Sequence, residues 1–194
     1  MSTAQLRIPG QTIDGTEGAA KTLLEKAKAQ MGFVPNMYAG MANSPGLLET
    51  YLLGYQRFRE ASGFTAVEQE VVLLTISRFH GCTYCMAAHS MIADKMSKVP
   101  AEVLEALRTG GLIPDARLAA LSEFTAIMVE QRGNPTTEQF EAFLAAGYGD
   151  REVLDIVLAI AVKTISNYSN HLLHTEVDAA FRAYAWEPRP VTTV

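Results

Sequence analysis

The sequence predicts an all-α fold, and three observations lead to this expectation. Segments that begin with a helix-capping residue and end at a glycine follow one another along the chain. No run combines the alternating pattern of a strand with hairpin turns, and the β-branched stretch 71–76 follows a capping box, which favours a helix. With 48% hydrophobic and 19% charged residues, 194 residues can bury a sizeable core. We therefore expect about eight to ten helices.

Two helices are expected in the first third of the chain. Segment 17–30 ends before Gly32, and glycine suits the left-handed conformation at the end of a helix. Ser44 and Pro45 form a cap followed by a first-turn proline. They begin a helix that we expect to continue to about Ala61.

A capping box begins the next helix. Thr65 and Glu68 occupy the two positions of the box, and the apolar run after them continues the helix toward Gly81. Gly81 interrupts the run, and we expect another helix over 82–97, before Pro100. The sequence therefore predicts two helices joined by a tight turn at Gly81.

The second half of the chain shows the same signals. Gly110, Gly133 and Gly147 mark helix ends, and Thr136 forms a second capping box with Gln139. The helices expected here cover 101–108, 115–132, 136–147, 150–174 and a last short segment that contains Asp178.

We expect the chain to form one domain. No stretch rich in glycine, serine or proline divides residues 1–194, and only the ends, 1–15 and 187–194, are expected to be loosely ordered. Residues 70–89 share a weak similarity with residues 152–171. This similarity suggests that a helical hairpin was duplicated and that only the first copy kept its thiols.

Charge and hydropathy exclude several classes of function. The net charge is −5, without a run of basic residues, which argues against nucleic acid as a partner. The longest apolar stretch, 156–162, is far too short to span a membrane, and the first residues lack the pattern of a secretory signal. We therefore expect a cytoplasmic protein without membrane contact. No phosphate-binding loop or lipoyl attachment pattern indicates a bound cofactor.

The two cysteines of the chain are three residues apart. On a helix, Cys82, Cys85 and His89 would share one face, because residues three and four apart are neighbours on the helix surface. The break at Gly81 places Cys82 in the first turn, where unpaired N–H groups and the helix dipole stabilise a thiolate. This pattern is what a dithiol redox centre needs: one ionised thiol, a second thiol and a base nearby.

Glu70 is the acidic residue expected to approach this stripe. It lies twelve residues before Cys82, so a hairpin about Gly81 would bring it toward the thiols. Glu68 and Glu102 compete for the same role.

Structural interpretations of the same residues remain open at this point. Two cysteines on one apolar helix face can be simple core residues. A structural zinc site would use Cys82, Cys85 and His89, with Glu70 as a fourth ligand, but a second pair of ligands is missing, so we expect no metal. The other histidines lack such neighbours, and we interpret them as structural: His80, His171 and His174.

The spacing of Glu70, Cys82, Tyr84, Cys85 and His89 resembles the signature of the AhpD-like proteins, within the carboxymuconolactone decarboxylase superfamily. A looser resemblance to the larger, peroxidase-related branch extends over most of the chain. It rests on the segments 33–37, 44–45 and 167–171.

The resemblance implies an all-α fold built on helix hairpins, a homo-oligomer that is a trimer or a hexamer, and thiol-dependent reduction of hydroperoxides. It also implies that an external dithiol, a thioredoxin-like or lipoyl protein, serves as the reductant. One position departs from the pattern: the mycobacterial alkylhydroperoxidase type carries a histidine where this chain has Tyr84. Rate and substrate therefore do not carry over.

The mechanism that we expect assigns a role to each residue of the motif. Glu70 and His89 draw the proton from Cys85, which attacks the peroxide and becomes a sulfenic acid. Cys82 then condenses with it to form a disulfide. The order of the thiols stays open, because His89 favours Cys85 whereas the helix N-terminus favours Cys82. Tyr84 either orients the site by a hydrogen bond or packs against it.

Three rival functions are kept. They are a non-catalytic redox sensor or assembly protein, a lactone decarboxylase of the superfamily's type, and a general disulfide oxidoreductase. Four methionines are expected either to line an apolar approach to the thiols, which would suit an organic peroxide, or to pack in the core: Met37, Met41, Met86 and Met91.

Overall fold

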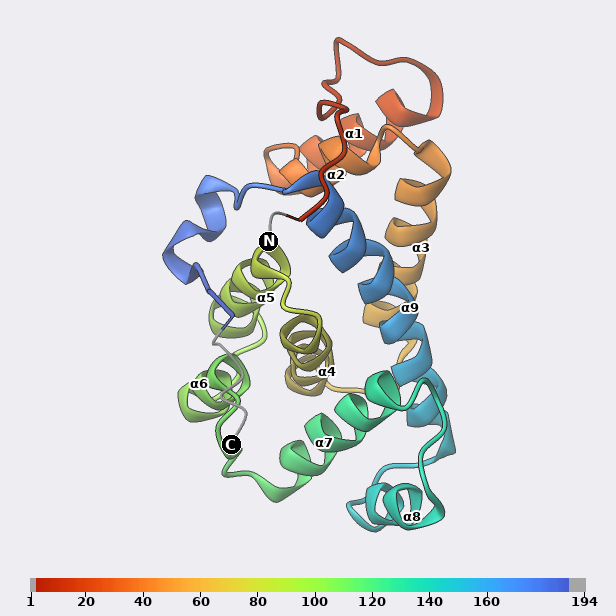
Figure 1. The fold of residues 1–194 in the computed structure, drawn as a ribbon, viewed down its shortest axis with the longest axis vertical. Helices are drawn as coiled ribbons and strands as arrows, with labels where there is room; N and C mark the ends of the chain where they lie inside the picture. The colour runs from red at the N-terminus through yellow and green to blue at the C-terminus, as the bar shows by residue number, and fades with distance from the viewer. Residues whose placement is uncertain (1–2, 189–194) are drawn as a thin grey trace.

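The computed structural model describes residues 3–188, and within them the chain forms nine α-helices and one 3₁₀ helix, without a strand (Figure 1). The predicted all-α fold is therefore confirmed. In chain order the helices are α1 (Gly18–Met31), α2 (Asn36–Met41), α3 (Pro45–Ala61), α4 (Ala66–Phe79), α5 (Thr83–Lys95), α6 (Ala101–Thr109), α7 (Ala116–Glu130), α8 (Thr137–Ala145), α9 (Asp150–Leu173) and η1 (Ala179–Tyr184).

Local sequence signals account for most of these boundaries. Gly32 ends α1 in the left-handed conformation, at φ 80°. Thr65 and Thr136 both form complete capping boxes, at the starts of α4 and α8. The short helix α2 was not expected, because it has only six residues and follows Pro35 without a side-chain cap. The last helix is a 3₁₀ helix, as short terminal segments often are.

The proposed internal duplication is wrong in its register. Residues 70–89 form the end of α4, a turn and the start of α5, whereas residues 152–171 lie within the single helix α9. A hairpin is therefore aligned with an uninterrupted helix. The shared pattern reflects an apolar helix face that occurs in both segments.

Helix α4 is the centre of the molecule. Ten consecutive residues from Glu68 to Ser77 are buried, because α5, α6, α7 and α9 all pack around this helix. Helix α9, the longest, lies along α3 and also contacts α2, α4 and α5 (Figure 1). The long helix α9 thus contacts both helices that the α4–α5 turn joins.

The buried side chains form two clusters. One joins α4 to α7 and α8, where the rings of Phe124, Phe143 and Tyr148 stack with centroids 4.2 and 4.7 Å apart. The other includes both cysteines together with residues of α1, α2, α3 and η1. The first cluster packs the central helix α4 against α7 and α8, and the second contains the predicted site.

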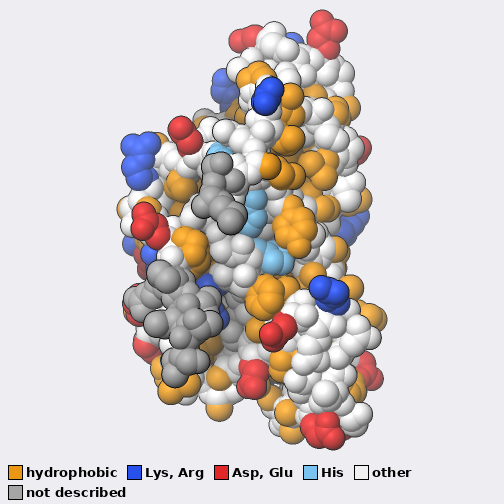
Figure 2. Space-filling view, in the orientation of Figure 1, with side chains coloured by type: hydrophobic (Ala, Val, Ile, Leu, Met, Phe, Trp, Pro, Cys, Tyr) orange, Lys and Arg blue, Asp and Glu red, His pale blue; other side chains and the backbone are white. Residues whose placement is uncertain are grey.

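Charged side chains are spread over the surface of the protein. On the described part of the face in Figure 2, positive and negative side chains are scattered, and neither sign gathers into a large patch. Among the described residues, no helix combines the length and the apolar character needed to cross a membrane. Several large apolar side chains of α9 are exposed: Leu154, Val157, Tyr168 and Leu172.

Candidate active site

The turn between α4 and α5 sets the position of both cysteines. Gly81 adopts φ 69°, a conformation that residues with a Cβ rarely adopt, and so reverses the chain after α4. Cys82 is the N-cap of α5, one position before the first turn in which we expected it. Cys85 lies in that first turn, near the unpaired N–H groups of the helix.

Both thiols are free and buried. Cys82 is 0% exposed and Cys85 is 2% exposed. Cys85 lines a cavity of about 390 Å³, large enough for a small organic molecule. Any substrate of this thiol would therefore react inside the protein, away from bulk water.

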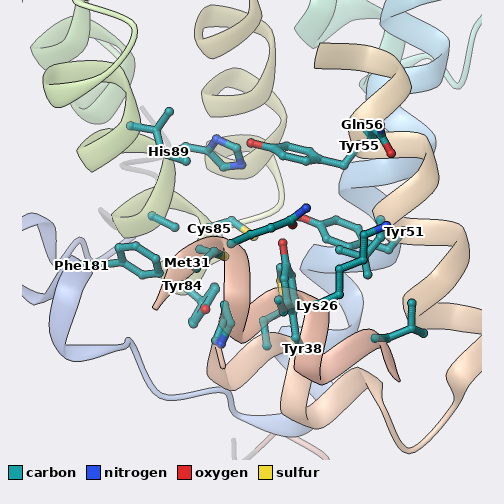
Figure 3. A pocket seen from close by; sticks show the side chains of 18 of the residues that line it. Lys26, Met31, Tyr38, Tyr51, Tyr55, Gln56, Tyr84, Cys85, His89 and Phe181 are labelled. Carbon is teal, nitrogen blue, oxygen red and sulfur yellow. The ribbon is translucent and has the colours of Figure 1, made fainter. Parts of the chain in front are cut away.

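The cavity is lined by aromatic rings that come from four helices (Figure 3). Tyr51 lies 5.9 Å from both Tyr38 and Tyr55, measured between ring centroids. Burial raises the pKa of each of these three hydroxyls, so the rings are neutral near pH 7. The other aromatic side chains of the lining are Tyr84, His89 and Phe181.

Of the two alternatives for the four methionines, packing in the core describes most of them. Met37 alone of the four candidates lines the cavity, together with Met31, which the sequence analysis did not single out. Met41 and Met86 are fully buried in the two core clusters. Methionines at helical spacing fill core gaps here, and tyrosines form much of the cavity wall.

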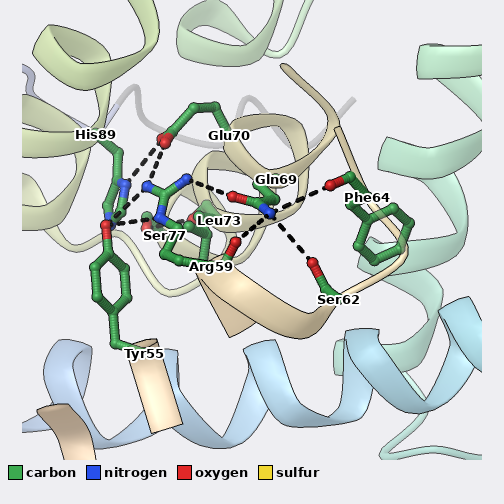
Figure 4. A network of polar contacts seen from close by, with 9 residues as sticks. All are labelled: Tyr55, Arg59, Ser62, Phe64, Gln69, Glu70, Leu73, Ser77 and His89. Carbon is green, nitrogen blue, oxygen red and sulfur yellow. Dashed lines mark hydrogen bonds and ion pairs between the residues drawn. The ribbon is translucent and has the colours of Figure 1, made fainter. Parts of the chain in front are cut away.

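His89 and Glu70 meet as the sequence analysis expected. Glu70 Oε2 lies 2.9 Å from His89 Nδ1, and its other oxygen pairs with Arg59 (Figure 4). Arg59 also donates to Tyr55 Oη at 2.7 Å and to Gln69 Oε1 at 3.0 Å. A continuous polar chain thus runs from α3 through α4 to the ring of His89 beside the cavity.

The protonation states of Glu70 and His89 follow from their contacts. Burial raises the pKa of Glu70, but His89 and Arg59 outweigh it and hold that pKa below its usual value. Burial and the charge of Lys163 lower the pKa of His89, although Glu70 opposes them. Near neutral pH, Glu70 is therefore ionised and His89 is neutral. The carboxylate accepts from Nδ1, which makes Nε2 the basic nitrogen of the ring.

The competing carboxylates have other positions. Glu68 belongs to the capping box of Thr65 and contacts Arg117 at 3.0 Å and Tyr148 at 3.1 Å. Glu102 is exposed in the first turn of α6. Of the three candidates, Glu70 is the one joined to His89.

Helix α9 supplies polar partners to both sulfur atoms. Asn170 Nδ2 lies 3.4 Å from Cys85 Sγ and 3.7 Å from Cys82 Sγ, and Ser166 Oγ lies 3.8 Å from Cys85 Sγ. Lys163 is fully buried one turn before Ser166. Sequence reasoning missed Lys163 and Ser166. Their spacing with Asn170 as a polar stripe in an apolar helix was the signal that could have revealed them.

The two thiols differ in acidity. Burial raises the pKa of Cys85, but the hydrogen bond from the Cys82 thiol and the charge of Lys163 outweigh burial and bring that pKa well below its usual value. The same hydrogen bond, together with burial, raises the pKa of Cys82. Cys85 is therefore the thiolate of the pair.

Tyr84 contacts the C-terminal segment instead of a thiol. Its hydroxyl donates to Asp178 Oδ2 at 2.5 Å, and its ring packs edge-to-face on Phe181 at 6.1 Å. Asp178 also accepts the backbone N–H of Asn36 at 3.2 Å. Tyr84 thus holds the segment that closes one wall of the cavity.

Removing this hydroxyl tests that role. We expect Tyr84→Phe to lower the free energy of unfolding by about 1.5–3 kcal/mol, the value of a buried hydrogen bond to a charged group. Hydrogen exchange should increase around Asp178 and Phe181, while the acidity of Cys85 stays unchanged. Tyr168→Phe, at an exposed ring, is the matched control. An unchanged stability in Tyr84→Phe would contradict the anchoring role.

A metal centre is not assembled from these side chains. Within residues 3–188, no group of three or more histidine, cysteine, aspartate or glutamate side chains is placed to hold a metal ion. His89 Nδ1 and Glu70, two members of the conceivable zinc site, are instead bonded to each other.

This protein is helical and contains a buried dithiol. Three solved structures share its fold. A peroxidase-related protein from Ralstonia eutropha JMP134, described as an alkylhydroperoxidase AhpD core, has a TM-score of 0.79 at 21% identity, covering 90% of this chain and 93% of its own. A peroxidase-related protein from Silicibacter sp. TM1040 has a TM-score of 0.74 at 19% identity, covering 92% and 96%. The debrominase Bmp8 in complex with 2,3,4-tribromopyrrole has a TM-score of 0.71 at 19% identity, covering 95% and 97%. These likenesses define an AhpD-like fold.

A family model also matches part of the sequence. Residues 45–126, from the start of α3 into α7, match the model of the carboxymuconolactone decarboxylase family. The resemblance to the AhpD-like proteins of this superfamily is therefore confirmed. No curated protein is significantly similar in sequence to this chain.

Proposed function

We propose that this protein is a thiol-dependent peroxidase that reduces organic hydroperoxides, or hydrogen peroxide, through a Cys82–Cys85 disulfide. The observation that carries this proposal is the position of Cys85, which lines a cavity three residues from a second free thiol, Cys82, and whose pKa is lowered by its surroundings. A thiolate is the form of cysteine that attacks an O–O bond.

In the first step, the Cys85 thiolate attacks the outer oxygen of the hydroperoxide. An S–O bond forms, the O–O bond breaks, and Cys85 becomes a sulfenic acid while the peroxide takes up two electrons. The leaving alkoxide takes a proton from water and departs as an alcohol. His89 lines the cavity, and Glu70 fixes its tautomer through Nδ1, which leaves Nε2 as the ring nitrogen that can accept a proton.

In the second step, the Cys82 thiol attacks the sulfenic sulfur. The hydroxyl group leaves as water with the proton of Cys82, and the disulfide closes. An external dithiol, a thioredoxin-like or lipoyl protein, returns two electrons by exchange. No bound cofactor takes part. A reducing compartment such as the cytoplasm suits this cycle.

We expect a homo-oligomer, and the exposed apolar side chains of α9 suit a contact between subunits.

The test is dithiol-dependent consumption of cumene hydroperoxide by the wild-type protein, with intact mass recorded after peroxide alone. We expect turnover and a loss of two hydrogens. The control is the double variant Cys82→Ser/Cys85→Ser, which keeps the cavity without thiols. A wild-type protein that forms the disulfide without turning over would favour the redox-sensor or assembly alternative. Reduction of protein disulfides without a preference for peroxide would favour a general disulfide oxidoreductase.

A second candidate function is reductive removal of halogen from an aromatic compound. The tyrosine-lined cavity beside a thiolate favours it, and a debrominase shares the fold. The thiolate would take a halogen as X⁺, the carbon would gain a proton, and Cys82 would release halide on closing the disulfide. Bromide release from a brominated phenol, measured with the same protein and dithiol, decides between the two reactions. Conversion of a lactone by the cysteine-free variant would instead support decarboxylase chemistry.

A further inference from the structure

Lys163 is a buried cation that the peroxidase mechanism above does not use. Its side chain is 0% exposed, and within residues 3–188 its Nζ has no hydrogen-bond partner. An ammonium group removed from water without a counter-charge is strongly unfavourable. A buried lysine therefore needs a nearby anion if it is to stay charged.

Helix α9 places Lys163 on the face that meets the thiols. One turn later, Ser166 Oγ lies 3.8 Å from Cys85 Sγ, and a further turn later Asn170 Nδ2 lies 3.4 Å from the same sulfur. Ser166 Oγ also donates to the carbonyl of Lys163 at 3.2 Å. Residues at this spacing share one side of a helix. α9 packs directly against α5, which carries Cys85.

We propose that Lys163 is the counter-ion of the Cys85 thiolate, and that this ion pair, more than His89, keeps the reacting sulfur ionised. The purpose of the pair rests on the proposed function, whereas the pair itself can be measured without peroxide. Lys163 is a positioning residue in this scheme, since it acts through the sulfur of Cys85.

The other charged and titratable groups around the sulfur already have polar partners or are neutral. On α4, Glu70 is paired with Arg59 of α3 and bonded to His89 of α5. Asp178, before η1, accepts from Tyr84 and from a backbone N–H. The remaining titratable neighbours are neutral near pH 7. They are Cys82, which keeps its proton, His80, which is hydrogen-bonded to Asn167, and the phenols Tyr38, Tyr51, Tyr55 and Tyr84. Lys163 is thus the cation beside the thiols whose Nζ has no other polar partner among the described residues.

Oxidation removes the negative charge from this ion pair. When the disulfide closes, the Cys85 thiolate and the Cys82 thiol give up two electrons to the hydroperoxide, and the negative charge of Cys85 disappears. Lys163 is then left without a counter-charge in the protein interior. The ion pair consequently stabilises the reduced form, and a disulfide whose reduced form is stabilised is easily reduced again.

The test measures the rate of iodoacetamide alkylation of Cys85 against pH, in a Cys82→Ser background. An opposite charge at close range lowers a pKa by about one to three units. We therefore expect Lys163→Met to raise the apparent pKa of Cys85 by at least about one unit, which slows alkylation about tenfold at a pH below both values. Lys28→Met, at an exposed lysine of α1, is the matched control and should leave the profile unchanged. His89→Asn should shift the profile less than Lys163→Met does.

Two results would overturn the proposal. One is an unshifted profile in Lys163→Met, and the other is a shift in His89→Asn as large as that in Lys163→Met. Lys163→Gln is a second variant of similar length in case Lys163→Met fails to fold, and circular dichroism checks both. In the protein with both cysteines, Lys163→Met should also raise the oxidised fraction at a fixed glutathione ratio, and an unchanged or lower fraction counts against the pair. A shifted profile in a protein that does not consume peroxide would refute the peroxidase function and leave the ion pair standing.

Discussion

The Cys85→Ser variant is expected to lose hydroperoxide turnover by a factor on the order of 10³ or more, because a serine hydroxyl at ordinary acidity cannot replace the thiolate as nucleophile. Cys85 is the thiol that lines the cavity and whose pKa is lowered. The measurement is the rate of peroxide consumption with excess dithiol. Circular dichroism should show an unchanged helix content, since serine is smaller and fits the same site.

Cys82→Ser is the matched variant, with the same substitution three residues earlier. It should also stop multiple turnover, but it should still consume one equivalent of peroxide and give a sulfenic acid at Cys85. Trapping with dimedone, followed by peptide mass analysis, locates that sulfenic acid. Trapping at Cys82 in the Cys85→Ser protein, with none at Cys85 in the Cys82→Ser protein, would reverse the assignment of the attacking thiol.

Glu70→Gln is expected to destabilise the fold by about 3–5 kcal/mol, the cost of removing one partner from a buried ion pair. Glu70 is fully buried, and its two oxygens are shared between Arg59 and His89. Without the carboxylate, Arg59 keeps its charge in a largely buried position with only neutral partners. Urea unfolding of the two proteins at pH 7 measures the difference. Glu49→Gln, at an exposed position of α3, is the control and should change stability little.

The effect of Glu70→Gln on the free energy of unfolding should depend on pH. The pKa of Glu70 is lowered in the folded protein, so its stabilising effect is fully present above the unfolded value of about 4.3 and is lost as the pH falls through the lower, folded value. The stability gap between wild type and Glu70→Gln should therefore narrow on acidification below about pH 4.3. A gap that stays constant from pH 7 to pH 3 would show that the carboxylate contributes through packing alone.

Local sequence signals determined much of the scaffold. Thr65 and Thr136 each hold the capping box that their spacing predicted. Gly32 adopts the predicted left-handed conformation, and Gly81 forms the predicted break between two helices. These features depend on residues at most four apart, so the sequence shows them directly. The meeting of Glu70 with His89 could also be anticipated, because a tight turn at Gly81 forces the adjoining helices together.

The tertiary structure alone decided what surrounds the sulfur atoms. Asn170 and Lys163 approach the thiols from a helix about eighty residues further along the chain, and nothing local marks a lysine in an apolar helix as a partner of Cys85. The tyrosine rings of the cavity likewise come from separate helices, α2, α3 and α5. The acidity of a thiol depends on every charge and hydrogen bond within a few ångströms, whatever their separation in sequence. The sequence by itself therefore determined that a dithiol sits at a helix start beside a histidine. The hydrogen bond between the two thiols and the packing of α9 against α5 together lower the pKa of Cys85 below that of Cys82.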